Sequence, residues 1–439
     1  MSIKLGVLSD FKQSRYVIHL STGKRLVLFR LPSIDPSRSK ANETDDGWSY
    51  FAMEAECPHA GGPMADSSVD IEDSAYVVSC PWHAYDFNVE TGESSVGITA
   101  CTFPVDVRGE FVTLGYPAED VGLVKLEPVS EKVKLKNQRA ENTVPTSPGD
   151  PGVARYLDDN ATVCDWAVHI LNTPHPEHKI ELTTHLFSTF TSREASSSPM
   201  ELGRGTVSPP AQPPREGLTE VKPQYMPRPG KGGTLKSRIA MLHALANIEL
   251  WAIDLAIDIC ARFSKFQTEG HGRELPRTFF HDWLKVAADE AKHFSILRAR
   301  IEEMGSHFGS LPVHHGLWLS ATETAHDIRS RISIIALVHE ARGLDVNPMT
   351  IEKFRKAGDP ESVAVLEVIH NDEITHVTTG HRWLTWICEQ EGTDPVHVFR
   401  TNVSKHFRGP IRGPFNEEAR LQAGMDKRYY ENAVGAVGA

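Results

Sequence analysis

Two copies of an Asp-Glu-x-x-His motif contain the residues of this sequence that are best able to bind metal. The copies are Asp289, Glu290 and His293, and Asp372, Glu373 and His376. Residues three positions apart share one face of a helix, so each copy can present one oxygen and one nitrogen atom to the same ion. Carboxylate oxygen together with imidazole suits iron or manganese. The repeated motif therefore predicts a site for two metal ions.

Two further carboxylates, Glu249 and Glu340, lie on the apolar stripes of predicted helices. An unpaired buried carboxylate costs roughly several kcal/mol, so glutamates at such positions must be paired, protonated or bound to metal. One motif alone would be explained as well by a solvated helix face and a buried histidine. The repeat and the added glutamates favour a di-metal set of four carboxylates and two imidazoles. His339 is a rival ligand, and His243 and Glu323 are weaker candidates.

Asp289 and Asp372 each directly precede the glutamate of a motif. A carboxylate beside a ligand histidine can accept a hydrogen bond from the ring nitrogen that does not bind metal, and so fixes the orientation of the ring. We expect this role for both aspartates.

A second set of metal-ligand residues lies near the N-terminus. Cys57 and His59 are followed, after twenty residues, by Cys80 and His83. In a Rieske centre one iron binds two thiolates and the other binds two imidazoles, but mixed cysteine and histidine spacing is also found at zinc sites. The surrounding sequences, CPHAGGPM and CPWHAYDF, resemble the cluster loops of Rieske ferredoxins and Rieske oxygenase domains. This resemblance favours a 2Fe-2S cluster over zinc.

The elements that must position these residues differ between the two parts of the chain. Short β-type runs separated by Gly, Pro, Asn and Asp occupy residues 1–117 and predict an all-β domain with a loop inserted at 32–47. Residues 118–153 mix charge with Pro and Ser and predict a linker. Residues 154–430 are expected to form a second domain, in which the Pro-, Ser- and Gly-rich segment 190–233 wraps a helical bundle.

Helical periodicity dominates residues 235–392. Four predicted helices each direct one of the four glutamates toward the interior of the bundle. The expected fold is therefore a multi-domain α+β protein, with an N-terminal all-β Rieske domain and a C-terminal all-α four-helix bundle.

The composition and net charge of the chain limit which classes of partner molecule and which cellular location we expect. The formal net charge of -12 disfavours nucleic acid, because phosphate binding needs a basic surface. Six cysteines, two of them in the Rieske motif, do not indicate a disulfide framework. We find neither a signal-peptide pattern nor a membrane-spanning apolar run. These features predict a cytoplasmic protein that acts on a small molecule and could form a homo-oligomer.

The helical part resembles a ferritin-like domain family related to di-iron tRNA hydroxylases. The resemblance spans about residues 155–430 and is carried by the stretches 166–171, 243–250, 289–294, 340–345, 372–377 and 414–420. It implies a ferritin-like fold with two iron ions held by the residues named above. It implies no particular reaction, because one fold supports many reactions.

Together these features predict a non-haem di-iron monooxygenase, an oxidoreductase that uses O2 to hydroxylate or N-oxygenate a small molecule. The Rieske cluster would pass electrons one at a time to the two irons, after reduction by an external NAD(P)H-dependent reductase. A rubrerythrin-like peroxidase or oxidase, which reduces peroxide or O2, is the alternative. Iron storage or sensing is a further alternative, which the fused Rieske domain disfavours.

Overall fold

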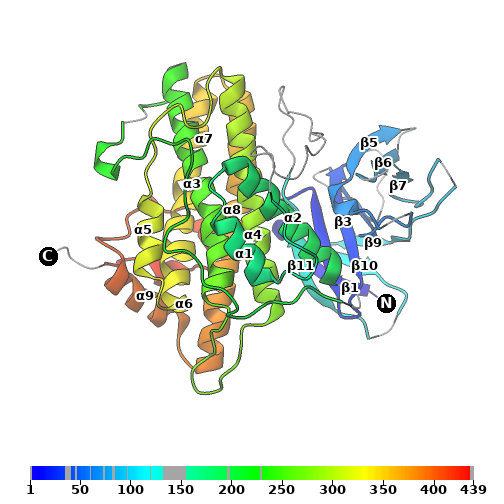
Figure 1. Ribbon diagram of the computed structural model, residues 1–439. Helices are drawn as coiled ribbons and strands as arrows, with labels where there is room; N and C mark the ends of the chain where they lie inside the picture. The colour runs from blue at the N-terminus through cyan, green and yellow to red at the C-terminus, as the bar shows by residue number, and fades with distance from the viewer. Residues whose placement is uncertain are drawn as a thin grey trace. The chain divides into compact units, whose positions relative to one another are not determined.

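The computed structural model, shown in Figure 1, contains an all-β region and a helical region. It describes residues 2–34, 41–44, 47–59, 61–72, 75–81, 85–95, 97–118, 120–131, 155–194, 198–227 and 230–435. The chain divides into two compact units, Met1–Lys132 and Val133–Ala439. The predicted α+β class, with an N-terminal all-β part and a C-terminal helical part, is confirmed.

In its described residues, the first unit consists of antiparallel strands in three small sheets. The sheet orders are β1-β10-β9, β11-β2-β3-β4-β8 and β5-β6-β7. The strands are β1 (Ser2–Val7), β2 (Arg15–Leu20), β3 (Arg25–Pro32), β4 (Trp48–Glu54), β5 (Ser68–Glu72), β6 (Ala75–Ser79), β7 (Asp86–Asn88), β8 (Thr102–Phe103), β9 (Val105–Arg108), β10 (Phe111–Gly115) and β11 (Leu123–Pro128). Two short 3-10 helices, η1 (Leu8–Asp10) and η2 (Met64–Asp66), interrupt them.

The two hydrophobic clusters of this unit lie on opposite faces of β4. Successive side chains of a strand point to opposite faces. Phe51 and Met53 accordingly belong to one cluster, and Tyr50 and Ala52 belong to the other. The cluster that contains Phe51 also contains both cysteines of the Rieske motif.

The sequence places the start of the linker too early. Strand β11, Leu123–Pro128, lies inside the stretch 118–153 and pairs with β2 along the edge of the five-stranded sheet. The charged residues of this strand made it resemble a linker in the sequence. A strand can carry them because an edge strand tolerates polar side chains that a central strand does not. Residues 132–153 of the predicted linker and part of the predicted loop 32–47 lie outside the described residues.

The second unit is helical in its described part. Its helices are α1 (Val163–Leu171), α2 (Pro176–Glu194), η3 (Pro223–Tyr225), α3 (Leu235–Arg262), α4 (Arg277–Glu303), α5 (Gly316–Glu323), α6 (Ile328–Arg331), η4 (Ile332–Glu340), α7 (Ala341–Lys356), α8 (Pro360–Glu391), α9 (Pro395–His406), α10 (Glu417–Gln422) and α11 (Lys427–Tyr430). Helix α2 continues to Glu194, so the predicted wrapping segment begins later than 190. No helix in the described residues is long and apolar enough to cross a membrane.

Local sequence signals explain where the long helices begin and end. The side chain of Thr234 caps α3 by accepting a hydrogen bond from the Ser237 amide, and Asp359 caps α8 in the same way. Pro360 occupies the first turn of α8, where a missing N–H costs nothing. Gly392 ends α8 in the left-handed conformation, with φ of 65°.

Four long helical segments pack together around the polar residues of the predicted site. Helix α3 packs against α4, α4 packs against α8, and α8 contacts both η4 and α7 (Figure 1). The segment η4 is a π-helix, whereas the sequence indicated an ordinary α-helix. Wide π turns in otherwise α-helical segments are frequent at functional sites. Glu340 is the last residue of this segment.

Candidate metal centre

The packing of α3, α4 and α8 brings four of the predicted ligands together. One ligand atom from each of Glu249, Glu290, His293 and Glu373 lies within 4.8 Å of the others. All four side chains are buried, as is His376. Residues that stand far apart in the sequence thus form one compact group of carboxylate oxygens and imidazole nitrogens.

The Nδ1 atoms of both motif histidines face the glutamates. Nδ1 of His293 lies 3.1 Å from Oε2 of Glu290 and 3.7 Å from Oε2 of Glu249. Nδ1 of His376 lies 3.0 Å from Oε1 of Glu290 and 3.5 Å from Oε2 of Glu373. The carboxylate of Glu290 therefore lies between the two imidazoles.

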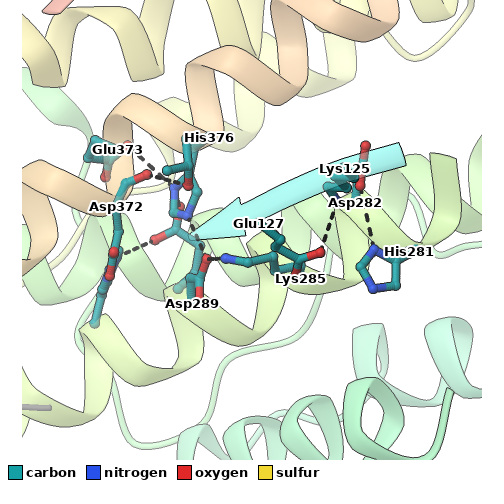
Figure 2. Close-up of polar contacts among 12 residues, drawn as sticks. Lys125, Glu127, His281, Asp282, Lys285, Asp289, Asp372, Glu373 and His376 are labelled. Carbon is teal, nitrogen blue, oxygen red and sulfur yellow. Dashed lines mark hydrogen bonds and ion pairs between the residues drawn. The ribbon is translucent and has the colours of Figure 1, made fainter. Parts of the chain in front are cut away.

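Each aspartate contacts the histidine of the opposite motif. Nε2 of His293 lies 3.0 Å from Oδ2 of Asp372, and Nε2 of His376 lies 3.4 Å from Oδ2 of Asp289. Figure 2 shows His376 directed toward Asp289, with Nζ of Lys285 on the same carboxylate at 2.6 Å. The aspartates accept from Nε2, which leaves Nδ1 of each ring on the side of the glutamates. This cross-pairing could not be predicted from the sequence.

The residues fit a metal centre because several of their polar atoms are buried without a hydrogen bond. In the described part of the chain, Oε2 of Glu249 and Oε2 of Glu373 accept no hydrogen bond, and Oε1 of Glu290 and Nδ1 of His376, 3.0 Å apart, form an ion pair without hydrogen-bond geometry. Buried polar atoms are rarely left in this state, and those that are need a specific explanation such as a bound ion. Hard carboxylate oxygens with imidazole nitrogens match the preferences of iron and manganese.

Burial and neighbouring charges shift the pKa values of residues in the site in opposite directions. Burial and the neighbouring Glu290 raise the pKa of Glu249 well above its ordinary value. Burial would lower the pKa of His293, but the neighbouring carboxylates of Asp372 and Glu249 raise it instead. Burial would raise the pKa of Asp289, but Lys285 and His376 lower it. Glu249 and His293 therefore bind protons more tightly than free side chains do, whereas Asp289 binds a proton less tightly.

Glu340 lies at the edge of this group, beside a small cavity. The cavity is lined by Glu290, Glu340 and His376 together with apolar residues of α3, α4 and η4, and has a volume of about 20 Å³. Burial and the neighbouring Glu373 and Glu290 raise the pKa of Glu340 well above its usual range. His339 instead points its Nε2 toward Oγ of Ser320, at 3.1 Å. The structure thus places Glu340, and not His339, beside the other glutamates.

The two weaker candidates lie away from the group. Nε2 of His243 accepts a hydrogen bond from the Gly309 amide at 2.9 Å, and the ring stacks on Phe308. Glu323, at the end of α5, forms an ion pair with Arg408. Two residues that the sequence did not single out do belong to the surroundings of the site. They are Lys285, four residues before Asp289, and Trp283, which lines the cavity.

In the first unit, the described part of the Rieske motif fits a cluster site. Cys57 and Cys80 are buried in one hydrophobic cluster, and neither forms a disulfide. The exposed ring of His59 stacks on Tyr85, with 4.2 Å between ring centroids. His83 lies outside the described residues. Two buried thiols near an exposed imidazole match the ligand types of a Rieske cluster, in which one iron binds sulfur and the other binds nitrogen.

Sequence comparison assigns both parts. Residues 172–431, well over half of the chain, match the family described as protein of unknown function (DUF455). The chain belongs to this family. Residues 4–101 match the Rieske 2Fe-2S domain, so the N-terminal unit is a Rieske domain, of the kind that transfers electrons through a 2Fe-2S cluster.

Two relatives each match a part of the chain. An uncharacterized protein of Haemophilus influenzae is 37% identical over 205 residues, which are 47% of this chain and 70% of that protein. A Rieske domain-containing protein of Homo sapiens is 39% identical over 44 residues, which are 10% of this chain and 28% of that protein.

Solved structures similar to this chain include proteins of carbazole 1,9a-dioxygenase systems. The ferredoxin from Nocardioides aromaticivorans is 17% identical, with a TM-score of 0.20, and the match covers 26% of this chain and 97% of the ferredoxin. The terminal oxygenase from Novosphingobium is 17% identical, with a TM-score of 0.20, and the match covers 27% of this chain and 30% of the oxygenase.

Proposed function

We propose that this protein is a di-iron oxygenase in which the helical unit is a ferritin-like domain and the Rieske domain supplies electrons. The observation that carries the proposal is the buried group of Glu249, Glu290, His293 and Glu373, whose ligand atoms converge within 4.8 Å. An electron-transfer domain on the same chain favours a catalytic cycle at the metal site over iron storage, because iron storage needs no dedicated electron donor. The substrate would be a small molecule that is hydroxylated or N-oxygenated.

The proposed roles of the residues follow from the geometry. Glu290 would help hold the metal beside both histidines, because its two oxygens face the two imidazoles. His293 and His376 would bind through Nδ1, while Asp372 and Asp289 hold their Nε2 atoms. Glu249, Glu340 and Glu373 would complete the set of four carboxylates and two imidazoles. Iron, when bound, would supply the redox chemistry with O2.

The proposed electron route starts in the Rieske domain. Cys57 and Cys80 would bind one iron of a 2Fe-2S cluster, and His59 and His83 would bind the other. An exposed imidazole such as that of His59 offers electrons a way in or out. A 2Fe-2S cluster carries one electron at a time, so two transfers would complete one cycle. An external NAD(P)H-dependent reductase would refill the cluster.

A rubrerythrin-like peroxidase or oxidase is the second candidate, and the size of the cavity favours it. A volume of about 20 Å³ holds about one water molecule and no organic substrate. Peroxide or O2 reduction needs no larger space at the metal. An oxygenase would have to admit its organic substrate through movement of the surrounding helices.

A metabolite comparison combined with metal analysis tests the proposal. We compare cells that contain the native protein with cells that contain Glu290→Ala, and use the exposed Glu389→Ala, on α8, as the matched control. We expect Glu290→Ala to lose iron and to cause one metabolite to accumulate and its oxygenated product to disappear. Glu389→Ala should change neither.

Rapid mixing separates the two candidates. The reduced, iron-loaded protein is mixed with O2 or with hydrogen peroxide, and oxidation of the metal is followed by absorbance. A fast reaction with O2, together with loss of the oxygenated product in cells that contain Glu290→Ala, would support the oxygenase. Fast peroxide turnover with unchanged metabolites would assign the protein to the peroxidases instead, and absence of bound iron would exclude both.

A further inference from the structure

An aromatic ring from one loop of the Rieske motif stacks on the histidine of the other loop. The ring of Tyr85 lies against that of His59, with 4.2 Å between the ring centroids and 19° between the ring planes. His59 is exposed, whereas Tyr85 is half-buried. Tyr85 therefore covers one face of an imidazole that the sequence predicts as a ligand of the 2Fe-2S cluster.

Strands β6 and β7 fix the position of the Tyr85 ring. The amide of Cys80 donates a hydrogen bond to the carbonyl of Tyr85 at 2.8 Å, which continues the pairing of these two strands by one step. Side chains alternate along a strand, so Tyr85 and Phe87 lie on the same face. Phe87 is fully buried in the hydrophobic cluster that contains Cys57 and Cys80, and Tyr85 packs against that hydrophobic cluster. The sheet thus holds the ring beside the two buried thiols.

The loop that carries His59 is closed by its own backbone. The amide of Cys57 donates to the carbonyl of Gly62, and the amide of Gly61 donates to the carbonyl of Cys57, both at 2.8 Å. These bonds fix the backbone around His59 and leave its side chain at the surface. The contact with Tyr85 acts on the imidazole itself, and it joins the two loops of the motif.

We propose that Tyr85 is a positioning residue of the Rieske domain, whose ring orients the His59 imidazole and lowers the reduction potential of the 2Fe-2S cluster. The face of an aromatic ring carries partial negative charge and attracts positive charge. Reduction adds one electron to the cluster and its ligands, so a ring face against a ligand imidazole favours the oxidised, more positive state. The inference rests on the Rieske assignment of this unit and requires no metal in the helical unit.

A redox titration of the full-length protein with its 2Fe-2S cluster tests this role, with the oxidation state followed by circular dichroism. Tyr85→Leu removes the ring and keeps an apolar side chain. We expect its reduction potential to rise, so that at the native midpoint potential the ratio of reduced to oxidised cluster increases about two- to fivefold, the effect of losing one exposed contact of this kind. Tyr85→Phe keeps the ring and should keep the native potential. Tyr85→Trp should lower the potential, because indole is the best aromatic partner for positive charge.

The order of these variants separates the proposed role from a structural one. A disturbed loop has no reason to shift the potential in opposite directions in Tyr85→Leu and Tyr85→Trp, whereas the charge of the ring face requires it. Tyr116→Leu is the matched control, because Tyr116 stacks on Phe103, with 5.4 Å between ring centroids, and packs against the other hydrophobic cluster of this unit. This control should keep the native potential.

Two results would overturn the inference. One is a native potential in Tyr85→Leu, and the other is a shift in Tyr85→Phe as large as that in Tyr85→Leu, which would assign the effect to the hydroxyl. If Tyr85→Leu does not assemble the cluster, Tyr85→Trp decides, since a potential at or above the native value contradicts the role of the ring. Absence of iron from the helical unit would refute the proposed function and leave these potentials unchanged.

Discussion

At the scale of single residues, the decisive feature is the cross-pairing of the two motifs. Asp372 contacts His293, and Asp289 contacts His376, so each motif fixes the imidazole of the other. A charged acceptor at Nε2 keeps Nδ1 directed at the glutamates and makes it more basic toward a metal ion. The motif repeat therefore supplies both the proposed ligands and the groups that would orient them.

Replacing Asp372 by asparagine should weaken metal binding. The amide can still accept a hydrogen bond from Nε2 of His293, but it lacks the negative charge, and loss of such a contact typically lowers metal affinity about 10- to 100-fold. Asp289→Asn should have a smaller effect, because its contact with His376 is longer, at 3.4 Å, and Lys285 neutralises part of its charge. Chelator competition for ferrous iron measures both. An affinity of Asp372→Asn equal to that of the native protein would show that the aspartate does not support the ligand.

Metal affinity should rise with pH. Burial raises the pKa of Glu249 and Glu340, and hydrogen bonds to carboxylates raise that of His293, so the metal-free site is protonated at pH values where free side chains are not. An incoming ion must displace these protons, and lowering the pH strengthens the competition. Calorimetry in buffers of different ionisation enthalpy should detect proton release on iron binding. Binding without proton release would contradict these pKa directions.

At the scale of elements, close contact between α8 and η4 depends on a glycine. A Cβ atom on Gly380 would lie 2.4 Å from Cβ of Ala336, so the two segments could not approach as they do. We expect Gly380→Ala to destabilise the protein by about 1 to 3 kcal/mol through overpacking. Gly343→Ala is the matched control, because its nearest neighbour lies 3.8 Å away, and alanine there should stabilise α7 by about 0.5 to 1 kcal/mol. Urea denaturation distinguishes the two, and equal stability of both variants would refute this packing argument.

The contact between α3 and the turn at Gly309 should make stability depend on pH. Burial, together with His307, lowers the pKa of His243 from 6.5 to about 4. Between pH 6.5 and pH 4, His243 therefore binds a proton in the unfolded chain but not in the folded chain. The free energy of unfolding therefore decreases as the pH falls from 6.5 toward 4. The loss attributable to His243 should be about 1 to 2 kcal/mol at pH 5 relative to pH 7.5. Denaturation of His243→Gln should show a flatter pH profile, whereas the exposed His397→Gln should keep the native one.

The elements also show how far the sequence predicts the structure. Apolar stripes with one glutamate each predicted the long helices, because buried faces leave a clear 3.6-residue period. The π-helix was not predicted, since Ile332, Ala336 and Glu340 fall four residues apart and satisfy an α-helical pattern equally well. The ligand types could be predicted from the motifs, but the pairing of Asp372 with His293 depends on how α4 and α8 pack. The role of the six residues as metal ligands stays a prediction.

At the scale of the whole molecule, the chain joins a Rieske domain to a helical domain of the DUF455 family. The proposed function needs both, because the helical unit would react with O2 and the Rieske domain would return it to the reduced state. The two units have separate hydrophobic clusters. Damage to one cofactor site should therefore leave the other able to bind its own metal.

Cys80→Ser tests this division of labour. The thiol is buried in the same cluster as Cys57, so its loss should prevent assembly of the 2Fe-2S cluster while the helical unit still binds iron. Turnover with NAD(P)H and a reductase should stop, because electrons can no longer enter. After chemical reduction, the variant should still consume O2 in a single turnover at the native rate, as the reaction with O2 needs only the helical site. Loss of both activities, with iron still bound there, would show that the Rieske domain takes part in the reaction with O2 itself.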